Sequence, residues 1–495
     1  MTEKSSLLDS YFARTKKEER ASDVVAYLAT LDHLQSASPS LADNILKELR
    51  KQRSTLKLIA SENYSSLTVQ LAMGNLLTDK YCEGYPYHRF YAGCENVDAI
   101  EAEAAESARS LFGAEHAYVQ PHSGADANLV AFWAILAQKI QNPTLEKLGK
   151  KNPDELTAEE FESLRQQLCN QKFMGMGLSS GGHLTHGFRQ NVSAKMMRAI
   201  TYEVDPKTHL LDYDAIARVA RKEKPLILLA GYSAYPRRVN FAKMRAIADE
   251  IGAVFMVDMA HFAGLVAGKA FNGEENPVPY AHMITSTTHK TLRGPRGGFV
   301  LCTSEFADSV NKGCPYVLGG PLPHVIGAKG IAFKEASTDA FSTYARKVIE
   351  NARALAEGLM KRGITLVTGG TDNHLVLLDV SNLGITGRIA EGALTEAGIT
   401  ANRNMVPLDS NGAWYTSGIR LGTPALTTLG MGKEEMDEVA DIIASILRAT
   451  RPMIMETGKP GKAKGESDKK VLEAARQRIK ALLGSYPLYP KLIID

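Results

Sequence analysis

One lysine stands in a setting that a solvated surface lysine does not need. Residues 285–298 read TSTTHKTLRGPRGG, so Lys290 follows four hydroxyl side chains and precedes Arg293, Arg296 and three glycines. A lysine amine attacks an aldehyde only when it is neutral, and burial or nearby cations lower its pKa toward that state. His289 and the two arginines offer cationic or dipolar neighbours. The segment therefore predicts a nucleophilic lysine.

Two other segments supply groups that would complement such a lysine. Asp258 ends the apolar run AVFMVD (253–258), and parallel sheets bind ligands beyond the carboxyl ends of their strands. A buried carboxylate is costly unless it is paired, so we expect a cationic partner; taken alone, Asp258 could equally cap the next helix. The run PHSGADAN (121–128) follows a strand and opens a helix, where glycine and serine suit a bound phosphate.

The combination of lysine, strand-end aspartate and phosphate seat is what pyridoxal phosphate requires. The lysine forms a Schiff base with the cofactor, and the aspartate keeps the pyridine nitrogen protonated so that the ring withdraws electrons. This joint pattern is far more specific than any one of its parts.

The elements that must position these residues alternate between helices and short apolar strands. Helices are expected over 41–57, 99–113 and 242–252, and strands over 117–120, 225–230 and 253–258. This alternation indicates an α/β protein with a mostly parallel sheet between helices. From about residue 336 the pattern changes to a long helix over 344–363 and a strand over 374–380.

Length and local composition divide the chain further. Its 495 residues exceed the roughly 250–300 at which a single core stops growing. We expect an N-terminal helical arm (1–60), a large cofactor-binding domain (61–336) and a small C-terminal α+β domain (337–495). Residues 142–172 are predicted to be a polar surface insertion with a helix that opens at a capping box from Thr157 to Glu160. The lysine- and glycine-rich segment 455–470 is expected to be a mobile linker rather than an anion site.

Composition argues against several kinds of partner and site. The formal net charge is +3, from 58 basic and 55 acidic residues, which gives no electrostatic case for nucleic acid or membrane partners. The five cysteines form no CxxC pair, so neither a disulfide framework nor a metal site is expected. There is no signal-peptide core and no apolar run of the roughly 18–20 residues that span a membrane. We expect a soluble cytoplasmic protein.

Six motifs occur in order along the chain: LIASENY (58–64), YCEGYP (81–86), GGHLTHG (181–187), VDMAHFAGL (257–265), TTHKTLRGPRGG (287–298) and SGIRLGTPA (417–425). Through them the chain resembles serine hydroxymethyltransferase, a fold-type-I pyridoxal phosphate enzyme with an aspartate aminotransferase-like fold, over nearly its whole length. The resemblance implies that L-serine and tetrahydrofolate are interconverted with glycine and 5,10-methylenetetrahydrofolate. It also implies a homodimer or a tetramer, because three site residues of this family reach the site of a neighbouring subunit.

The resemblance assigns a role to individual residues. Lys290 would form the Schiff base, Asp258 would pair with the pyridine nitrogen, and His183 would stack on the ring. The implied cofactor-binding residues are Lys290, Asp258, His261, His183, Ser233, Ser123, Gly124, Ala125 and, from a partner subunit, Gly320. The implied substrate-binding residues are Arg420, Ser61, Tyr91 and Glu83, and those for folate are Leu178, Gly182, Leu184 and Asn404. Catalytic roles fall to Lys290, Glu83, Tyr81 and His289, with Tyr81, Glu83 and Tyr91 supplied by the neighbouring subunit.

The chain departs from the family pattern around the phosphate and the folate. The departures are Ala125 and Leu318 near the phosphate, Tyr87, His88 and Phe90 after the YCEGYP motif, and Ser180, Met405 and Leu429 elsewhere. They are expected to change affinity for pyridoxal phosphate and folate more than the type of reaction, and to permit slow folate-independent side reactions. Two alternatives remain: a folate-independent enzyme of the same fold, such as a threonine aldolase or racemase, and a non-catalytic relative that acts as a binding protein.

Overall fold

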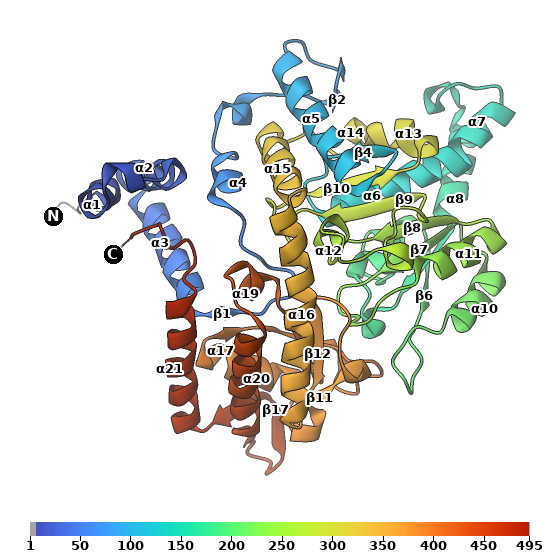
Figure 1. The fold of residues 1–495 in the computed structure, drawn as a ribbon. Helices are drawn as coiled ribbons and strands as arrows, with labels where there is room; N and C mark the ends of the chain where they lie inside the picture. Colours follow the sequence, from blue (N-terminus) through green and yellow to red (C-terminus); the bar gives the residue numbers. More distant parts are fainter. Residues whose placement is uncertain (1–5, 495) are drawn as a thin grey trace.

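A seven-stranded sheet forms the centre of the larger part of the molecule (Figure 1). The structure is a computed structural model and describes residues 6–494. The strand order is β4-β10-β9-β8-β7-β5-β6. The strands are β4 (His116–Tyr118), β5 (Lys172–Met176), β6 (Arg198–Tyr202), β7 (Ile227–Gly231), β8 (Val254–Asp258), β9 (Met283–Thr287) and β10 (Gly298–Cys302). Only β10 runs antiparallel to its neighbours β4 and β9, so the predicted mostly parallel α/β sheet is confirmed.

Both faces of this sheet are buried at its centre, which explains why β7 and β8 are apolar at almost every position. Successive side chains of a strand point to opposite faces. In β8, Val254 and Met256 enter one core while Phe255 and Val257 enter the other. The helices that contribute to the two cores are α5 (Glu95–Phe112), α6 (Gly124–Leu136), α10 (Tyr213–Glu223), α11 (Phe241–Ile251), α12 (Ala263–Ala267) and α15 (Pro323–Ala336). Gly113 ends α5 with φ 70°, as its sequence position predicts.

The long helix α16 (Asp339–Lys361) leads from this sheet to a second, four-stranded sheet (Figure 1). Its order is β11-β12-β15-β14, and every pairing is antiparallel. The strands are β11 (Thr365–Leu366), β12 (Leu375–Asp379), β14 (Asn402–Asn404) and β15 (Gly418–Gly422). The helices that share their core include α16, α17 (Gly387–Ala397), α20 (Lys433–Arg448) and α21 (Lys469–Ser485). The domain boundary near residue 336 stays a prediction.

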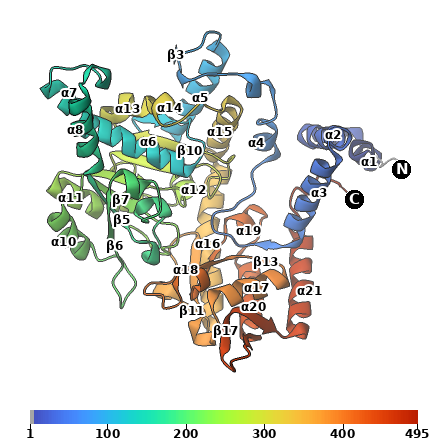
Figure 2. The same cartoon turned by 180° about the vertical axis from the view of Figure 1, so that it is seen from behind.

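The N-terminal helices pack against the C-terminal end of the chain (Figure 2). They are α1 (Leu7–Arg14), α2 (Ser22–Ala37) and α3 (Pro39–Ser54). The Arg53 guanidinium at the end of α3 donates to the carbonyl oxygens of Leu488, Tyr489 and Leu492. After α3, β1 (Leu56–Lys57) pairs in parallel with β13 (Ile399–Thr400). The chain runs through β1 from the arm toward the larger sheet. Residues 1–5 of the predicted arm lie outside the described residues.

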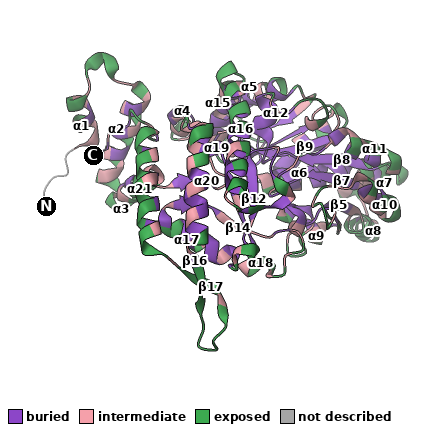
Figure 3. Ribbon diagram, turned by 60° about the horizontal axis from the view of Figure 1, so that its bottom comes forward, coloured by how far each residue is buried: buried purple, intermediate pink, exposed green. Residues whose placement is uncertain are grey.

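The two accessory segments behave differently. In the insertion, α7 (Asn142–Lys147) and α8 (Ala158–Cys169) form, and the predicted capping box between Thr157 and Glu160 is confirmed. The prediction of a mobile linker over 455–470 is wrong, because β16 (Thr450–Ile454) and β17 (Pro460–Ser467) form an antiparallel hairpin (Figure 3). The Thr386 hydroxyl on α17's N-cap donates to the Lys462 carbonyl, a long-range contact that local composition does not reveal.

Shorter elements complete the chain. They are α4 (Leu67–Leu71), β2 (Gly84–Tyr85), β3 (His88–Arg89), α9 (Ser193–Met196), α13 (Ala307–Asn311), α14 (Gly313–Tyr316), α18 (Gly412–Tyr415) and α19 (Pro424–Thr428). Among residues 6–494, no helix has both the length and the apolar character needed to cross a bilayer. All five cysteines are free thiols.

Candidate active site

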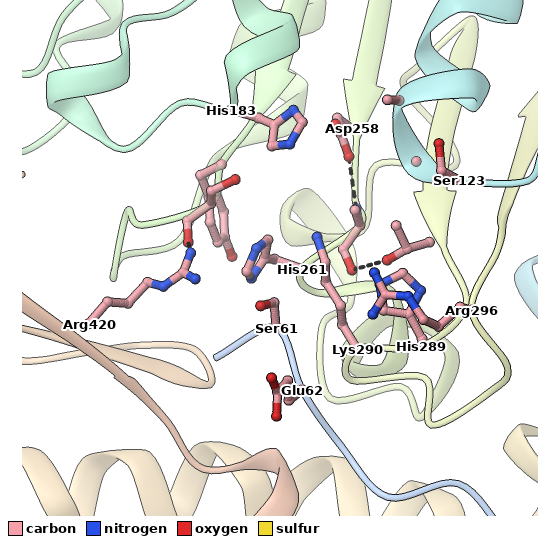
Figure 4. A pocket seen from close by; sticks show the side chains of 16 residues that line it. Ser61, Glu62, Ser123, His183, Asp258, His261, His289, Lys290, Arg296 and Arg420 are labelled. Carbon is pink, nitrogen blue, oxygen red and sulfur yellow. Dashed lines mark hydrogen bonds between the residues drawn. The ribbon is translucent and has the colours of Figure 1, made fainter. Parts of the chain in front are cut away.

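A cavity of about 480 Å³ lies beyond the carboxyl ends of β7, β8 and β9, where ligand sites of parallel sheets occur (Figure 4). Asp258 is the last residue of β8, and Lys290 follows β9 by three residues. Arg420 reaches the cavity from the middle of β15 in the second sheet. The lining residues are Ser61, Glu62, Ser123, Gly124, Ala125, His183, Tyr232, Ser233, Asp258, Ala260, His261, Thr287, His289, Lys290, Arg296 and Arg420.

Lys290 has the lowered pKa that a nucleophilic amine requires. Burial lowers the pKa of Lys290 to about 8; Asp258 opposes this shift, and Arg420 and Arg296 reinforce it. The prediction that Arg293 supplies a positive charge beside Lys290 is wrong. Its guanidinium lies 4.3 Å from the centre of the Tyr344 ring and turns away from the cavity. The amine therefore owes its reactivity to burial and to two arginines, one of them distant in sequence.

His289 lines the cavity as a neutral imidazole rather than as a cation. Burial lowers the pKa of His289 to about 3, and Arg296 and Lys290 add to the effect. Its Nδ1 atom is buried and has no hydrogen-bond partner within the described part of the chain.

Asp258 is buried but has three hydrogen-bond donors. Asn128 Nδ2 lies 2.9 Å and His186 Nε2 lies 3.1 Å from its Oδ2, and the Ala260 N–H donates to Oδ1 at 3.0 Å. Burial by itself would raise the pKa of Asp258, but the hydrogen bond and charge of His186, with His183 and Asn128, hold it below its ordinary value. The carboxylate is therefore ionised, and His186 is the direct partner that can carry the positive charge expected from the sequence.

His186 and Asn128 were not among the residues singled out from the sequence. His186 is the second histidine of the GGHLTHG motif, and this pair of histidines was the available signal. Asn128 lies on α6, one turn beyond the phosphate seat, where an amide has no distinctive sequence pattern. Its side chain connects Asp258 to two threonines, donating to Thr185 at 2.8 Å and accepting from Thr285.

The imidazoles of His183 and His261, which line the cavity, are uncharged. Burial lowers the pKa of His183 to about 4, in spite of the nearby Asp258 carboxylate. Burial also lowers the pKa of His261, whose Nδ1 lies 3.2 Å from His374 Nε2. Neutral rings can pack against a flat ligand without adding positive charge.

His183, His186 and Asp258 also bring three possible metal-ligand atoms within 4.8 Å of one another, so the absence of a metal site stays a prediction.

The helix that the sequence predicts after Ser123 forms as α6, and its N-terminus lines the cavity, while its role as a phosphate seat stays a prediction. Ser123 is the N-cap, and its hydroxyl accepts a hydrogen bond from the Asp126 N–H at 3.1 Å. Gly124 packs tightly, since a Cβ there would lie 2.7 Å from Thr287 Cγ2. The N–H groups of a helix N-terminus favour an anion. Ala125, in the first turn, also lines the cavity and offers no hydroxyl.

Arg420 is held rigidly at the opposite wall. Its Nη1 donates to the Ser233 carbonyl at 2.7 Å, and its Nε donates to Asn402 Oδ1 at 3.1 Å. Burial lowers the pKa of Arg420 to about 10, which leaves the guanidinium charged at neutral pH. A fixed guanidinium in a cavity can bind a carboxylate through two parallel hydrogen bonds.

Three predicted site residues do not line this cavity within one chain. The Tyr81 hydroxyl lies 3.3 Å from Glu83 Oε1, and the Tyr81 and Tyr91 rings meet edge to face with 4.9 Å between their centres. Tyr81 and Tyr91 are 54% and 45% exposed. Gly320, expected to act from a partner subunit, likewise lies next to the Tyr81 ring and outside the cavity.

Buried interactions of Arg89 hold the loop that carries Tyr81, Glu83 and Tyr91 in place. Arg89 donates to the carbonyls of Cys82 and Gly84 and forms ion pairs with Asp98 at 2.8 Å and Glu101 at 2.7 Å. The ion-paired side chains are nearly inaccessible, so the loop is ordered although its aromatic residues point outward. Exposed aromatic side chains on an ordered loop are typical of a surface that binds another protein.

The residues predicted to bind folate also lie outside the cavity lining. Leu178 begins the 3₁₀ turn at 178–180, Gly182 follows this turn by two residues, and Leu184 is 44% exposed. Asn404 ends β14, and its side-chain amide donates to the Met405 carbonyl at 2.7 Å. Within a single chain, these four residues therefore do not line the cavity.

The cavity fits pyridoxal phosphate by the chemistry of its walls. It presents an amine of lowered pKa, an ionised carboxylate, a helix N-terminus and neutral imidazoles, which match an aldehyde, a pyridinium, a phosphate and a flat ring. These features belong to one connected space, so they can act on one ligand.

The chain also matches known proteins over almost its whole length. Residues 34–146 and 161–443 match the family model described as serine hydroxymethyltransferase. The serine hydroxymethyltransferase of Treponema pallidum (strain Nichols) is 58% identical over 488 residues, which cover 99% of this chain and 85% of that protein. That of Chlamydia trachomatis serovar D is 57% identical over 493 residues, or 99% of each. That of Cutibacterium acnes is 58% identical over 468 residues, 94% of this chain and 95% of that protein. The chain therefore belongs to the serine hydroxymethyltransferase family.

Proposed function

We propose that this protein interconverts L-serine and tetrahydrofolate with glycine and 5,10-methylenetetrahydrofolate, with pyridoxal phosphate as its cofactor. Membership of the family makes it a transferase of serine and glycine one-carbon metabolism. The observation that carries the proposal is the convergence of Lys290, Asp258 and Arg420 on one cavity. These side chains suit an aldehyde, a pyridine nitrogen and an amino-acid carboxylate, and no simpler ligand needs all three.

The cofactor would be held at both ends of the cavity. Lys290 would bind its aldehyde covalently, Asp258 would pair with its ring nitrogen, and Ser123 and Gly124 would hold its phosphate. His183 would stack on the ring, and Ser233 and His261 would lie near its phenolic oxygen. When bound, pyridoxal phosphate withdraws electrons from the Cα atom of an attached amino acid. Asp258 supports this withdrawal because its retained negative charge keeps a proton on the ring nitrogen.

The amino acid would be oriented by its carboxylate. Arg420 would bind both carboxylate oxygens, and Ser61, on the wall near Lys290, would donate a further hydrogen bond. This grip fixes the bonds around Cα relative to the cofactor plane, so that the bond to be broken points out of the plane. The cleaved carbon passes to tetrahydrofolate with release of water, and Cα regains a proton.

Proton transfer would fall to a neighbouring subunit in a homodimer. Tyr81, Glu83 and Tyr91 lie on an ordered, outward-facing loop instead of in the cavity of their own chain. A symmetric dimer can place this loop over the partner's cavity, with Gly320 beside it. Folate would enter the same mouth, near Leu178, Gly182, Leu184 and Asn404. Cytoplasmic location and the absence of nucleic acid and membrane partners stay predictions.

Serine cleavage is expected to require tetrahydrofolate, while alanine reacts slowly without it. Omitting tetrahydrofolate should lower the rate of serine cleavage by at least about tenfold, since the one-carbon acceptor is then missing. Removal of the Cα proton of alanine needs only Lys290, Asp258 and Arg420. A proton that is regained on either face then gives slow racemisation or transamination. The measurements are glycine formation with and without folate, and chiral analysis of alanine after long incubation.

The Lys290→Arg protein serves as the control for both assays. Serine cleavage that is independent of folate would favour a threonine aldolase or racemase of the same fold. Absence of any cleavage or any visible absorbance band in protein given pyridoxal phosphate would favour the non-catalytic alternative. Equal background conversion of alanine in wild type and control would refute the expected side reaction.

Ala125→Ser is expected to strengthen cofactor binding. The new hydroxyl would lie in the first turn of α6, beside the phosphate seat, where it can donate to a charged oxygen. A hydrogen bond to a charged group contributes about 1.5–3 kcal/mol, so the dissociation constant should fall by about tenfold or more. Spectroscopic titration of cofactor-free protein measures the constant. An unchanged constant in Ala125→Ser, with Ala127→Ser as a buried control on the same helix, would contradict the position assigned to the phosphate.

A further inference from the structure

A second lysine, Lys329, is fully enclosed behind the cavity. It lies on α15 and is 1% exposed. Its Nζ donates three hydrogen bonds, to the carbonyl oxygens of Val119 at 2.6 Å, Pro121 at 2.9 Å and Gly298 at 2.9 Å. Lysine has three donors, and all of them are used by main-chain acceptors. Lys329 does not line the cavity, so it acts on the site only through these segments.

The three carbonyls belong to the two backbone segments that build the phosphate seat. β4 and β10 pair from His116 opposite Cys302 as far as Tyr118 opposite Val300, and then separate. Beyond that point Val119 and Pro121 lead to the helix N-cap, while Gly298 follows the glycine-rich turn after Lys290. Only one main-chain bond, from the Gly298 N–H to the Pro121 carbonyl at 2.9 Å, joins the segments there. Where β4 and β10 separate, the hydrogen bonds of the Lys329 ammonium group therefore take the place of the main-chain bonds that pair the two strands.

The packing around Lys329 leaves little freedom for either segment. A Cβ on Gly298 would lie 2.3 Å from the Ser123 carbonyl oxygen, so the backbones on the two sides of the seat are in direct contact. A Cβ on Gly297 would lie 2.5 Å from Lys329 Cε, so this glycine makes room for the lysine stem. Any movement of the ammonium would thus be transmitted to residues 121–124 and to residues 296–298 together.

We propose that Lys329 is a positioning residue that holds the phosphate seat of the cofactor in its binding conformation. The inference rests on the proposed function, since it presumes that the seat at Ser123 and Gly124 binds the phosphate of pyridoxal phosphate. Without the lysine, the Val119–Pro121 segment and the turn at 296–298 lose their common anchor. Binding of the phosphate must then order both segments, which weakens affinity without removing any group that touches the cofactor.

Lys329→Met tests this role. Methionine fills a similar space but donates no hydrogen bond, so the three carbonyls lose their shared donor. The dissociation constant of pyridoxal phosphate, measured by titrating cofactor-free protein at its visible absorbance band, should rise by at least about tenfold. At saturating cofactor, the KM for serine should stay within about threefold of wild type, because Arg420 is untouched. Thermal unfolding of the cofactor-free protein is measured in parallel.

A matched control separates positioning from general loss of stability. Asn351, on α16, is 2% exposed, and its Nδ2 donates to Thr427 Oγ1 and to the Met431 carbonyl, both at 2.9 Å. Asn351→Leu removes these buried bonds outside the cavity lining and should lower the unfolding temperature without raising the cofactor dissociation constant. If Lys329→Met fails to fold, Lys329→Gln, which keeps two N–H donors, is measured in the same way.

Each outcome decides one question. A weakened cofactor affinity in the Lys329 variant, and not in Asn351→Leu, supports the positioning role. A Lys329 variant that unfolds at a lower temperature but binds pyridoxal phosphate as tightly as wild type overturns it. Wild-type protein that binds no pyridoxal phosphate contradicts the proposed function itself, which is a distinct result from the first two.

Discussion

Lys290→Arg is expected to abolish covalent attachment of pyridoxal phosphate and to reduce serine cleavage by about 10³-fold or more. Arginine keeps the positive charge near Asp258 but stays protonated, so it cannot act as the amine nucleophile. The visible absorbance band of wild-type protein should be absent from the variant. Borohydride reduction of the wild-type protein with cofactor, followed by peptide mass analysis, should place the label on Lys290.

Lys172→Arg is the matched control for this substitution. Lys172 is an ion-paired lysine at the start of β5, 3.0 Å from Glu223 and outside the cavity. This variant should retain the absorbance band and the activity. Attachment of the cofactor to any other lysine in the wild type would contradict the assignment of Lys290.

The same variant can test whether Glu83 acts in a neighbouring subunit. Lys290→Arg and Glu83→Gln chains are each expected to be inactive as homodimers. When they are unfolded, mixed and refolded together, half of the dimers contain one chain of each kind, and each of these has one intact site. About a quarter of wild-type activity should then return. No recovery in dimers that have demonstrably exchanged would show that Glu83 acts within its own chain.

Arg420→Ala is expected to raise the KM for serine by about 10²–10³-fold, with a smaller effect on cofactor binding. Two charge-assisted hydrogen bonds to the substrate carboxylate are lost, each worth about 1.5–3 kcal/mol, and tenfold corresponds to about 1.4 kcal/mol. Arg420→Lys keeps the charge but loses the paired geometry, so its KM should lie between those of wild type and Arg420→Ala. Steady-state kinetics at saturating cofactor measures both effects.

Arg403 provides the control for the loss of a guanidinium in the same sheet. It lies on β14, opposite Ile419 of β15, and its side chain pairs with Glu391 instead of facing the cavity. Arg403→Ala should leave the KM for serine within about threefold of wild type. A wild-type KM in Arg420→Ala would show that the carboxylate binds elsewhere.

The local features of the fold were predictable because short segments determine them. The apolar runs at 225–230 and 253–258 form strands because both faces of the sheet are covered, and this coverage selects apolar residues at every position. The capping box from Thr157 to Glu160 also forms as its spacing predicts, since its two hydrogen bonds lie within one helical turn. Lys290 and Asp258 were recognisable for the same reason: Asp258 ends β8 and Lys290 follows β9 by three residues, at the edge of the sheet that the cavity adjoins.

Other features were decided by residues far apart in the chain. Arg293 stands three residues after Lys290, but its left-handed backbone, with φ 59°, and the ring of Tyr344 direct it away from the cavity. The hairpin in 450–467 is stabilised by pairing and by contact with α17, which composition alone does not indicate.

By itself, the sequence determined the α/β class and indicated Lys290, the strand-end Asp258 and the helix N-terminus at Ser123 as candidate site residues, because each depends on residue types and spacing within a few positions. Only the tertiary structure decided which side chains surround them. His186 and Asn128 donate to Asp258, and Lys329 joins the two backbones of the seat from a separate helix. These contacts bridge 31 to 210 positions, and hydrogen bonds of that kind depend on packing that residue spacing does not encode.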